Sequence, residues 1–181
     1  MEKGGNEMDI KLLLIEDDVN DVGLITDAIN EFEDVDWMGT EYHFVVEHLP
    51  GMGEKEKIRG REYLFYDDHI LDEIEQRIQK KANGINLGLL LDVVLTKDEL
   101  ESKDKNFYPE VNMARTIYER FHDKLPIYVL TSVPSFYTHS ERIMGADLSE
   151  QFIPKEVLLK YKMKSMLEKL KNYYIKWGQN E

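Results

Sequence analysis

Four short apolar segments of this chain each end in reactive polar side chains. They are 11–15, followed by Glu16 and Asp17; the run 87–95, which contains Asp92; 127–130, followed by Thr131; and 152–154, followed by Lys155. Burying an unpaired carboxylate costs several kcal/mol, so an acid in such a place usually meets a cation or lies at an exposed strand end. If the four strands are parallel, all of these groups lie at one edge of one sheet, where open α/β sheets place their sites.

Segments with helical spacing alternate with these strands. A further strand is predicted at 42–46, and apolar residues recur every three or four positions in the segments between strands. The predicted helices lie near 20–32, 70–84, 111–121, 136–144 and 159–177. Five strands alternating with five helices predict an α/β fold, a five-stranded parallel sheet with helices on both faces.

Composition excludes several classes of protein. The net charge of -13 argues against nucleic-acid binding, because a phosphate backbone would be repelled. The chain has no cysteine, which excludes disulfides and thiolate metal sites. The first residues lack the apolar core of a signal peptide, and no apolar run approaches the ~20 residues that span a bilayer. We therefore expect a cytoplasmic protein with no membrane partner.

The polar groups at the strand ends predict a magnesium site. Glu16, Asp17 and Asp92 would offer carboxylate oxygens, which Mg²⁺ prefers, and the cation would relieve their mutual repulsion. Lys155 and Thr131 could hold the oxygens of an arriving phosphoryl group. On this interpretation Asp92 is the nucleophile that becomes an acyl phosphate.

The ordered set of segments resembles the receiver domain of response regulators in two-component phosphorelay signalling. The matching pieces are residues 12–18, 90–95, 127–132, 144–147 and 152–155. The resemblance implies a flavodoxin-like, doubly wound fold. It also implies that Glu16 and Asp17 are the acidic pair, Asp92 the phosphoacceptor, and the backbone carbonyl of Val94 a further metal ligand. Thr131 and Lys155 would contact the phosphoryl group, and Thr131 and Phe152 would form the switch.

Compared with that family, the chain carries insertions. Asp17 and Asp92 are 75 positions apart (92 minus 17), which is more than the family spacing and places an insertion around 49–68. Residues 50–57, rich in glycine and charge, favour an exposed loop there. A second long loop is predicted around 96–109. The expected organisation is a flexible segment 1–9 and a single domain over 10–177.

The resemblance implies a signalling role and not an enzyme. Asp92 would accept phosphate from a histidine kinase or phosphotransfer protein with Mg²⁺, and the phosphorylated domain would bind an unknown downstream protein or a second copy of itself. Two alternatives remain. One is a receiver-like interaction module that is not phosphorylated, which Mg²⁺ and phosphate-analogue binding would distinguish. The other is a Mg²⁺-dependent aspartyl-phosphate phosphatase, disfavoured because Val94 stands where such enzymes carry a second acid.

Overall fold

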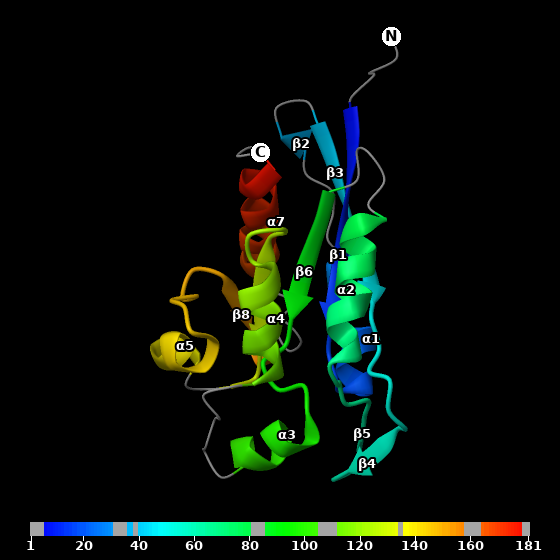
Figure 1. Ribbon diagram of the computed structural model, residues 1–181. Coiled ribbons are helices and arrows are strands. Elements are labelled where there is room, and N and C mark those ends of the chain that lie inside the picture. Colours follow the sequence, from blue (N-terminus) through cyan, green and yellow to red (C-terminus); the bar gives the residue numbers. More distant parts are fainter. Residues whose placement is uncertain are drawn as a thin grey trace.

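The computed structural model describes residues 6–30, 36–37, 40–80, 86–104, 112–133, 136–157 and 164–178. Its main sheet contains β1 (Asn6–Ile15), β2 (Asp36–Trp37), β3 (Thr40–His48), β6 (Asn86–Leu91), β7 (Ile127–Thr131) and β8 (Phe152–Pro154). The strand order is β2-β3-β1-β6-β7-β8, and all neighbours are parallel except β2, which pairs antiparallel with β3 at the edge (Figure 1). The predicted five-stranded parallel sheet is confirmed.

The order in which successive strands are added to the sheet reverses at β1. The chain moves outward from β1 to β3, and then returns to the other side of β1 through β6, β7 and β8. In a doubly wound sheet this reversal opens a crevice beyond the carboxyl ends of the central strands. The ends of β1 and β6, which pair from Ile10 with Asn86 to Ile15 with Leu91, therefore border that crevice.

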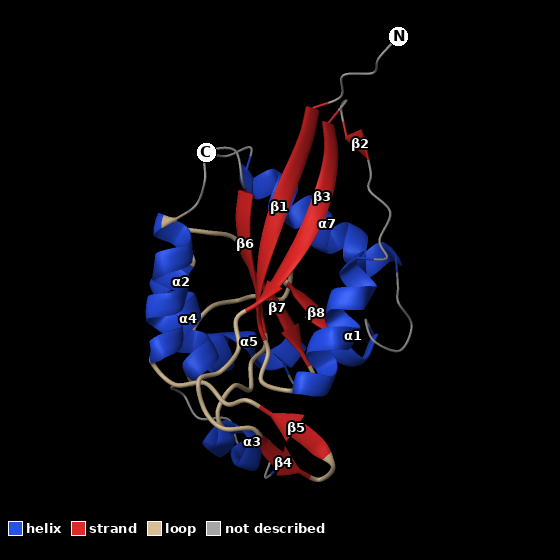
Figure 2. Cartoon of the chain, turned by 90° about the vertical axis from the view of Figure 1, so that its right-hand side faces the viewer, coloured by secondary structure: helices blue, strands red, loops and turns tan. Residues whose placement is uncertain are grey.

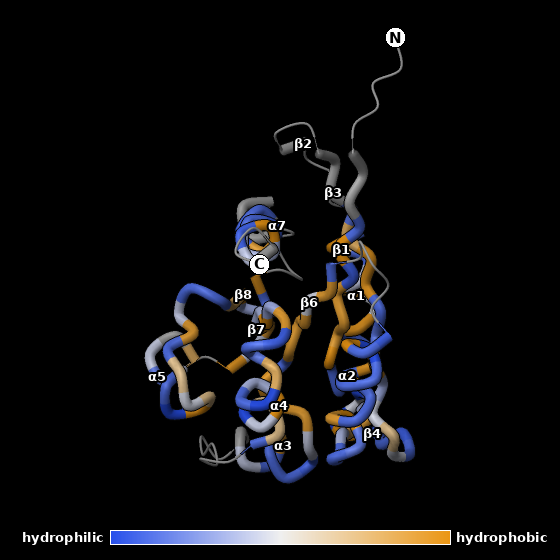
Figure 3. Tube along the Cα trace, turned by 45° about the horizontal axis from the view of Figure 1, so that its top comes forward, coloured by the Kyte–Doolittle hydropathy of each residue, from blue (hydrophilic) through white to orange (hydrophobic). Residues whose placement is uncertain are grey.

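Helices cover both faces of the sheet, as Figure 2 shows. Side chains alternate along each strand, so Leu13 and Ile15 join one core and Leu12 and Leu14 join the other. The first core is closed by α2 (His69–Gln79), α4 (Met113–Phe121) and α5 (Phe136–Met144), and the second by α1 (Val19–Asn30) and α7 (Lys164–Gly178). Figure 3 shows the apolar strands lying between more polar helices.

Three predicted features differ in the structure. Residues 6–9, expected in a flexible segment, belong to β1, because their backbone pairs with residues 40–43 of β3. The expected insertion 49–68, in which residues 50–57 were expected to form an exposed loop, contains a hairpin of β4 (Glu56–Ile58) and β5 (Arg61–Tyr63). The expected loop 96–109 begins with α3 (Lys97–Asp104).

Helix α3 is held by a buried acid that the sequence did not single out. The carboxylate of Glu99 accepts hydrogen bonds from the backbone N–H groups of Leu95 at 2.8 Å, Thr96 at 3.1 Å and Met113 at 2.7 Å. These contacts tie α3 to the loop after β6. No helix in the described ranges has both the length and the apolar character to cross a bilayer.

Gly88 of β6 lies directly against the ring of Tyr174 from α7. A Cβ at this position would lie 2.0 Å from the ring, and the Tyr174 hydroxyl donates a hydrogen bond to the carbonyl of Leu89. The close approach therefore needs glycine.

We expect Gly88→Ala to destabilise the protein by about 1–3 kcal/mol, as overpacking of a core does. Chemical denaturation with circular dichroism would measure the change. Gly23→Ala in α1 is the matched control, because nothing lies within 4 Å of its Cβ. That control should be neutral or gain up to about 1 kcal/mol from helix propensity. Equal losses in both variants would contradict the packing argument.

Candidate functional site

Three acids gather where β1 and β6 end. Glu16 and Asp17 follow β1 directly, and Asp92 follows β6. Their side chains are buried, with exposed fractions of 1%, 2% and 4%, and one oxygen from each lies within 4.8 Å of the others. The predicted convergence of these three residues is therefore present, and the paired register of β1 and β6 produces it.

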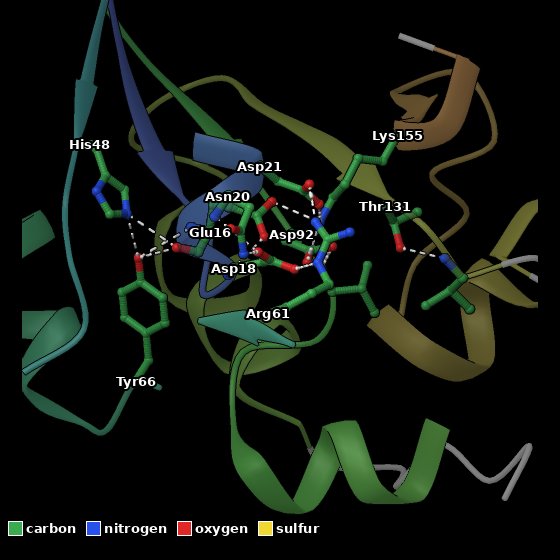
Figure 4. A network of polar contacts seen from close by, with 12 residues as sticks. Glu16, Asp18, Asn20, Asp21, His48, Arg61, Tyr66, Asp92, Thr131 and Lys155 are labelled. Carbon is green, nitrogen blue, oxygen red and sulfur yellow. Dashed lines mark hydrogen bonds and ion pairs between the residues drawn. The ribbon is translucent and has the colours of Figure 1, made fainter. Parts of the chain in front are cut away.

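Lys155 enters the same cluster from the end of β8. Its Nζ lies 2.7 Å from Glu16 Oε2 and 2.9 Å from Asp92 Oδ2, and 3.6 Å from Asp21 Oδ2. Both of the shorter contacts are ion pairs, and the contact with Asp92 is also a hydrogen bond (Figure 4). The lysine is 4% exposed, so these charges interact with little screening from water.

The electrostatics of the cluster follow from its burial. Burial, with the neighbouring charge of Asp92, raises the pKa of Asp17 to about 8. The same two causes raise the pKa of Glu16 well above its ordinary value, although Lys155 acts against them. Burial opposes the charge of Lys155, but Asp92 and Glu16 outweigh it and raise the pKa of the ammonium group. One lysine thus balances only part of the acidic charge.

Two buried oxygens of the cluster have no hydrogen-bond partner among the described residues, Glu16 Oε2 and Asp17 Oδ2. Glu16 Oε2 lies in the ion pair with Lys155 Nζ at 2.7 Å, so the oxygen that most needs a ligand is Asp17 Oδ2. A buried acceptor without a partner costs about 1–3 kcal/mol. A divalent cation held by several carboxylates would satisfy this oxygen and offset the repulsion, and hard oxygen ligands suit Mg²⁺. The donor set therefore fits the predicted ion.

Thr131 ends β7 beside Lys155. It pairs in register with Pro154 of β8, the residue before the lysine, and is 2% exposed. Its Oγ1 accepts a hydrogen bond from the backbone N–H of Val133 at 3.0 Å, which leaves the hydroxyl proton to be donated elsewhere. The predicted strand-end hydroxyl therefore lies at the same edge as the acids.

The other predicted residues lie around this edge. Val94 is buried in the loop that follows Asp92. Phe152 is half-buried in β8, and its ring packs against Phe136 of α5 with centroids 5.3 Å apart. The roles of Val94 as a ligand and of Phe152 as a switch remain predictions.

The sequence analysis missed an arginine next to the acids. Arg61 of β5 donates from Nε to Asp18 Oδ2 and from Nη2 to Asp21 Oδ1. Asp18 precedes α1 and Asp21 lies in its first turn. Only the fold brings Arg61 to these acids, which are more than 35 positions away, so no local pattern could have indicated the contact.

A buried tyrosine also supports the site. The hydroxyl of Tyr66 accepts from the backbone N–H of Glu16 at 3.1 Å and donates to the carbonyl of Leu49. His48 Nε2 lies 3.1 Å from the carbonyl oxygen of Glu16, and burial lowers the pKa of this histidine. These groups hold the backbone that carries Glu16 and Asp17.

The comparisons with known proteins do not place this chain in a family. No family model matches the chain, and no curated protein matches it. One solved structure that matches is described as the crystal structure of a probable GTP-binding protein engB. It shares 15% sequence identity with this chain at a TM-score of 0.47, over 96% of this chain and 99% of the other.

These findings correct the predicted family. No receiver domain appears among them, and the matching structure is described as a GTP-binding protein, so we withdraw the assignment to response-regulator receivers. The two-component signalling function, both of its alternatives and the expectation that the chain is not an enzyme are withdrawn with it. The predicted kinase, phosphotransfer, downstream and homodimer partners are withdrawn as well.

A similarity at this level does not make the chain a GTP-binding protein either. The residues that follow β1 are Glu16, Asp17 and Asp18, where a phosphate-binding loop would need glycines and a lysine. The function therefore has to be argued from the site itself.

The raised pKa of Asp17 predicts a pH-dependent stability of the metal-free protein. The folded protein keeps a proton on Asp17 that the unfolded chain, with an ordinary value of 3.8, has lost; stability therefore falls as pH rises from 3.8 to about 8. One such proton gives a slope of about 1.4 kcal/mol per pH unit. Urea unfolding at pH 6, 7 and 8 with a chelator would measure it.

Asp17→Asn should reduce this slope by the share of one proton, leaving any contribution from Glu16, and should stabilise the metal-free protein at pH 8. Asp27→Asn, which alters an exposed acid on α1, is the control and should keep the slope of the wild type. A slope that survives unchanged in Asp17→Asn would show that Asp17 does not carry the effect.

Proposed function

We propose that this chain binds Mg²⁺ together with a phosphoryl group at the carboxyl edge of its sheet. The observation that supports this most is the buried Asp17 Oδ2, which has no hydrogen-bond partner among the described residues and lies with two further buried carboxylates, both of them paired with the buried Lys155. An acidic cluster by itself is common, but a buried acceptor without a partner is a group that a bound metal ion would satisfy.

Glu16, Asp17 and Asp92 would hold the ion through their carboxylates, with the carbonyl of Val94 as a further ligand. Bound Mg²⁺ would supply positive charge to the oxygens of a phosphoryl group. The three acids follow two adjacent, paired strands, so the backbone keeps their carboxylates close together. Such a fixed set of carboxylates suits one shared ion.

Lys155 and Thr131 are the proposed phosphoryl-binding residues. Lys155 already lies 2.9 Å from Asp92 Oδ2, so an oxygen of a group placed at Asp92 would fall within its reach. Thr131, which pairs with Pro154 next to Lys155, would donate its hydroxyl proton to another of these oxygens.

Asp92 is the proposed acceptor of the phosphoryl group. A carboxylate oxygen of Asp92 would form the new bond to phosphorus while the bond from phosphorus to its former oxygen breaks, and that leaving oxygen would depart with the electron pair. Lys155 remains protonated throughout, because its raised pKa keeps it a cation near neutral pH. The cytoplasm is the proposed location, in keeping with a chain without cysteine.

Mg²⁺ should raise the thermal stability of the wild type, because an ion that binds only the folded state stabilises it by mass action. At a concentration 100 times the dissociation constant the gain is about 2.7 kcal/mol. Differential scanning calorimetry across a MgCl₂ series would measure it, and beryllofluoride, a phosphoryl analogue, should add a further increase.

Three variants separate the roles. Asp17→Asn should lose the response to Mg²⁺, Lys155→Met should lose mainly the additional response to beryllofluoride, and Asp27→Asn should keep both. A wild type whose unfolding ignores both MgCl₂ and beryllofluoride would rule out the proposed function.

A further inference from the structure

The inserted hairpin of β4 and β5 is attached to both loops that flank the acidic site. Residue 63 forms an isolated β-bridge with Asp18, and the N–H of Leu64 donates to the carbonyl of Asp17 at 2.8 Å. On the other side, Lys97 of α3 pairs with Glu56 of β4 at 2.7 Å. The hairpin therefore lies against the loop after β1 and the segment after β6.

A tight turn fixes which residue of the hairpin faces the acids. Ile58 pairs with Arg61, and the two residues between them, Arg59 and Gly60, have φ angles of 51° and 84°. Two positive φ angles are what a two-residue turn of type I′ requires, and such a turn sets the register of the strands. Because side chains alternate along β5, Arg61 and Tyr63 share the side that meets the acidic loop.

Arg61 and Lys155 share one carboxylate. Asp21 accepts a hydrogen bond at Oδ1 from Arg61, while its Oδ2 lies 3.6 Å from Lys155 Nζ. Lys155 is closer to Asp92, at 2.9 Å, and to Glu16, at 2.7 Å. Figure 4 shows Arg61 and Lys155 on either side of these carboxylates. Asp21 is thus satisfied by the arginine, and the lysine is left to the inner acids.

We propose that Arg61 is a positioning residue that keeps Lys155 on Asp92 by neutralising Asp21. The side chain of Asp21 is 11% exposed, so without Arg61 its carboxylate would need another cation. Lys155 is the cation already within 4 Å, and its flexible stem allows the move. A lysine drawn to Asp21 would leave Asp92 and the phosphoryl oxygens.

This inference rests on the proposed function, because the position of Lys155 affects activity or binding only where a phosphoryl group binds at Asp92. Arg61 itself need not touch that group. The insertion would then be part of the site, acting from the second strand of its hairpin through Asp21.

The first measurement needs no ligand. A crystal structure of Arg61→Gln should show Lys155 Nζ within hydrogen-bond distance of Asp21 and farther from Asp92 than in the wild type. In the double variant Arg61→Gln/Asp21→Asn the lysine should return to Asp92. A lysine that stays on Asp92 in Arg61→Gln would overturn the proposal, whether or not the protein binds Mg²⁺.

The second measurement is beryllofluoride affinity in saturating MgCl₂ by isothermal titration calorimetry. Arg61→Gln should weaken binding about tenfold, which is the size expected when one charge-assisted contact is lost. Adding Asp21→Asn should restore the affinity to within about threefold of the Asp21→Asn single variant, because Arg61 would act only through Asp21 and two residues in contact are coupled and not additive. A tenfold loss that persists in the double variant would mean direct contact between Arg61 and the ligand, and would overturn the positioning role.

Arg77→Gln is the matched control, because it removes an exposed arginine that pairs with Glu47 at 2.9 Å and not with the acidic loop. It should bind beryllofluoride as the wild type does. If Arg61→Gln fails to fold, as judged by circular dichroism, Arg61→Lys replaces it: a lysine keeps the charge but lacks the planar fork that contacts Asp18 and Asp21 together, so an intermediate loss is expected. A wild type that binds no beryllofluoride would refute the proposed function, while the crystal structures would still decide the role of Arg61.

Discussion

The site depends on one constraint, the burial of three carboxylates around a single ammonium group. Parallel strands bring Glu16, Asp17 and Asp92 to one edge, and Lys155 contacts two of them. Such a cluster repels itself in a medium of low polarity, and one cation cannot balance it. The raised pKa values of Glu16 and Asp17 express this imbalance. A divalent cation is the simplest way to remove it.

The surroundings of the cluster reduce the imbalance from outside. Arg61 neutralises the outer acids Asp18 and Asp21, and Tyr66 holds the backbone at Glu16. Both residues belong to the insertion, so this segment supports the site and also contacts the loops at the carboxyl ends of β1 and β6. The buried Glu99 has a comparable role on the opposite side, where it fixes the loop after β6 through backbone N–H groups. An acidic site of this kind needs partners on every side.

The elements that the sequence predicted well are those with strong periodicity. The apolar segments at 12–15, 87–91 and 127–131 are buried throughout, and α5 ends at Met144, directly before Gly145 with its φ of 75°. The hairpin at 56–63 and the helix at 97–104 were not predicted, because both segments are short and mostly polar, and their stability comes from contacts with other segments. The family assignment went further than such patterns allow, and the comparisons did not support it.

The sequence by itself determined the strand ends and therefore the chemical groups that each strand delivers. Local periodicity is enough for this, since a strand that is apolar on both faces must be buried and must stop where the polar groups begin. Only the tertiary structure decided which cationic side chain pairs with which acid. The pairing of Arg61 with Asp21, and of Lys155 with Asp92, joins residues 40 and 63 positions apart. Such pairing follows from the register of the strands and the attachment of the hairpin, which no local stretch of sequence contains.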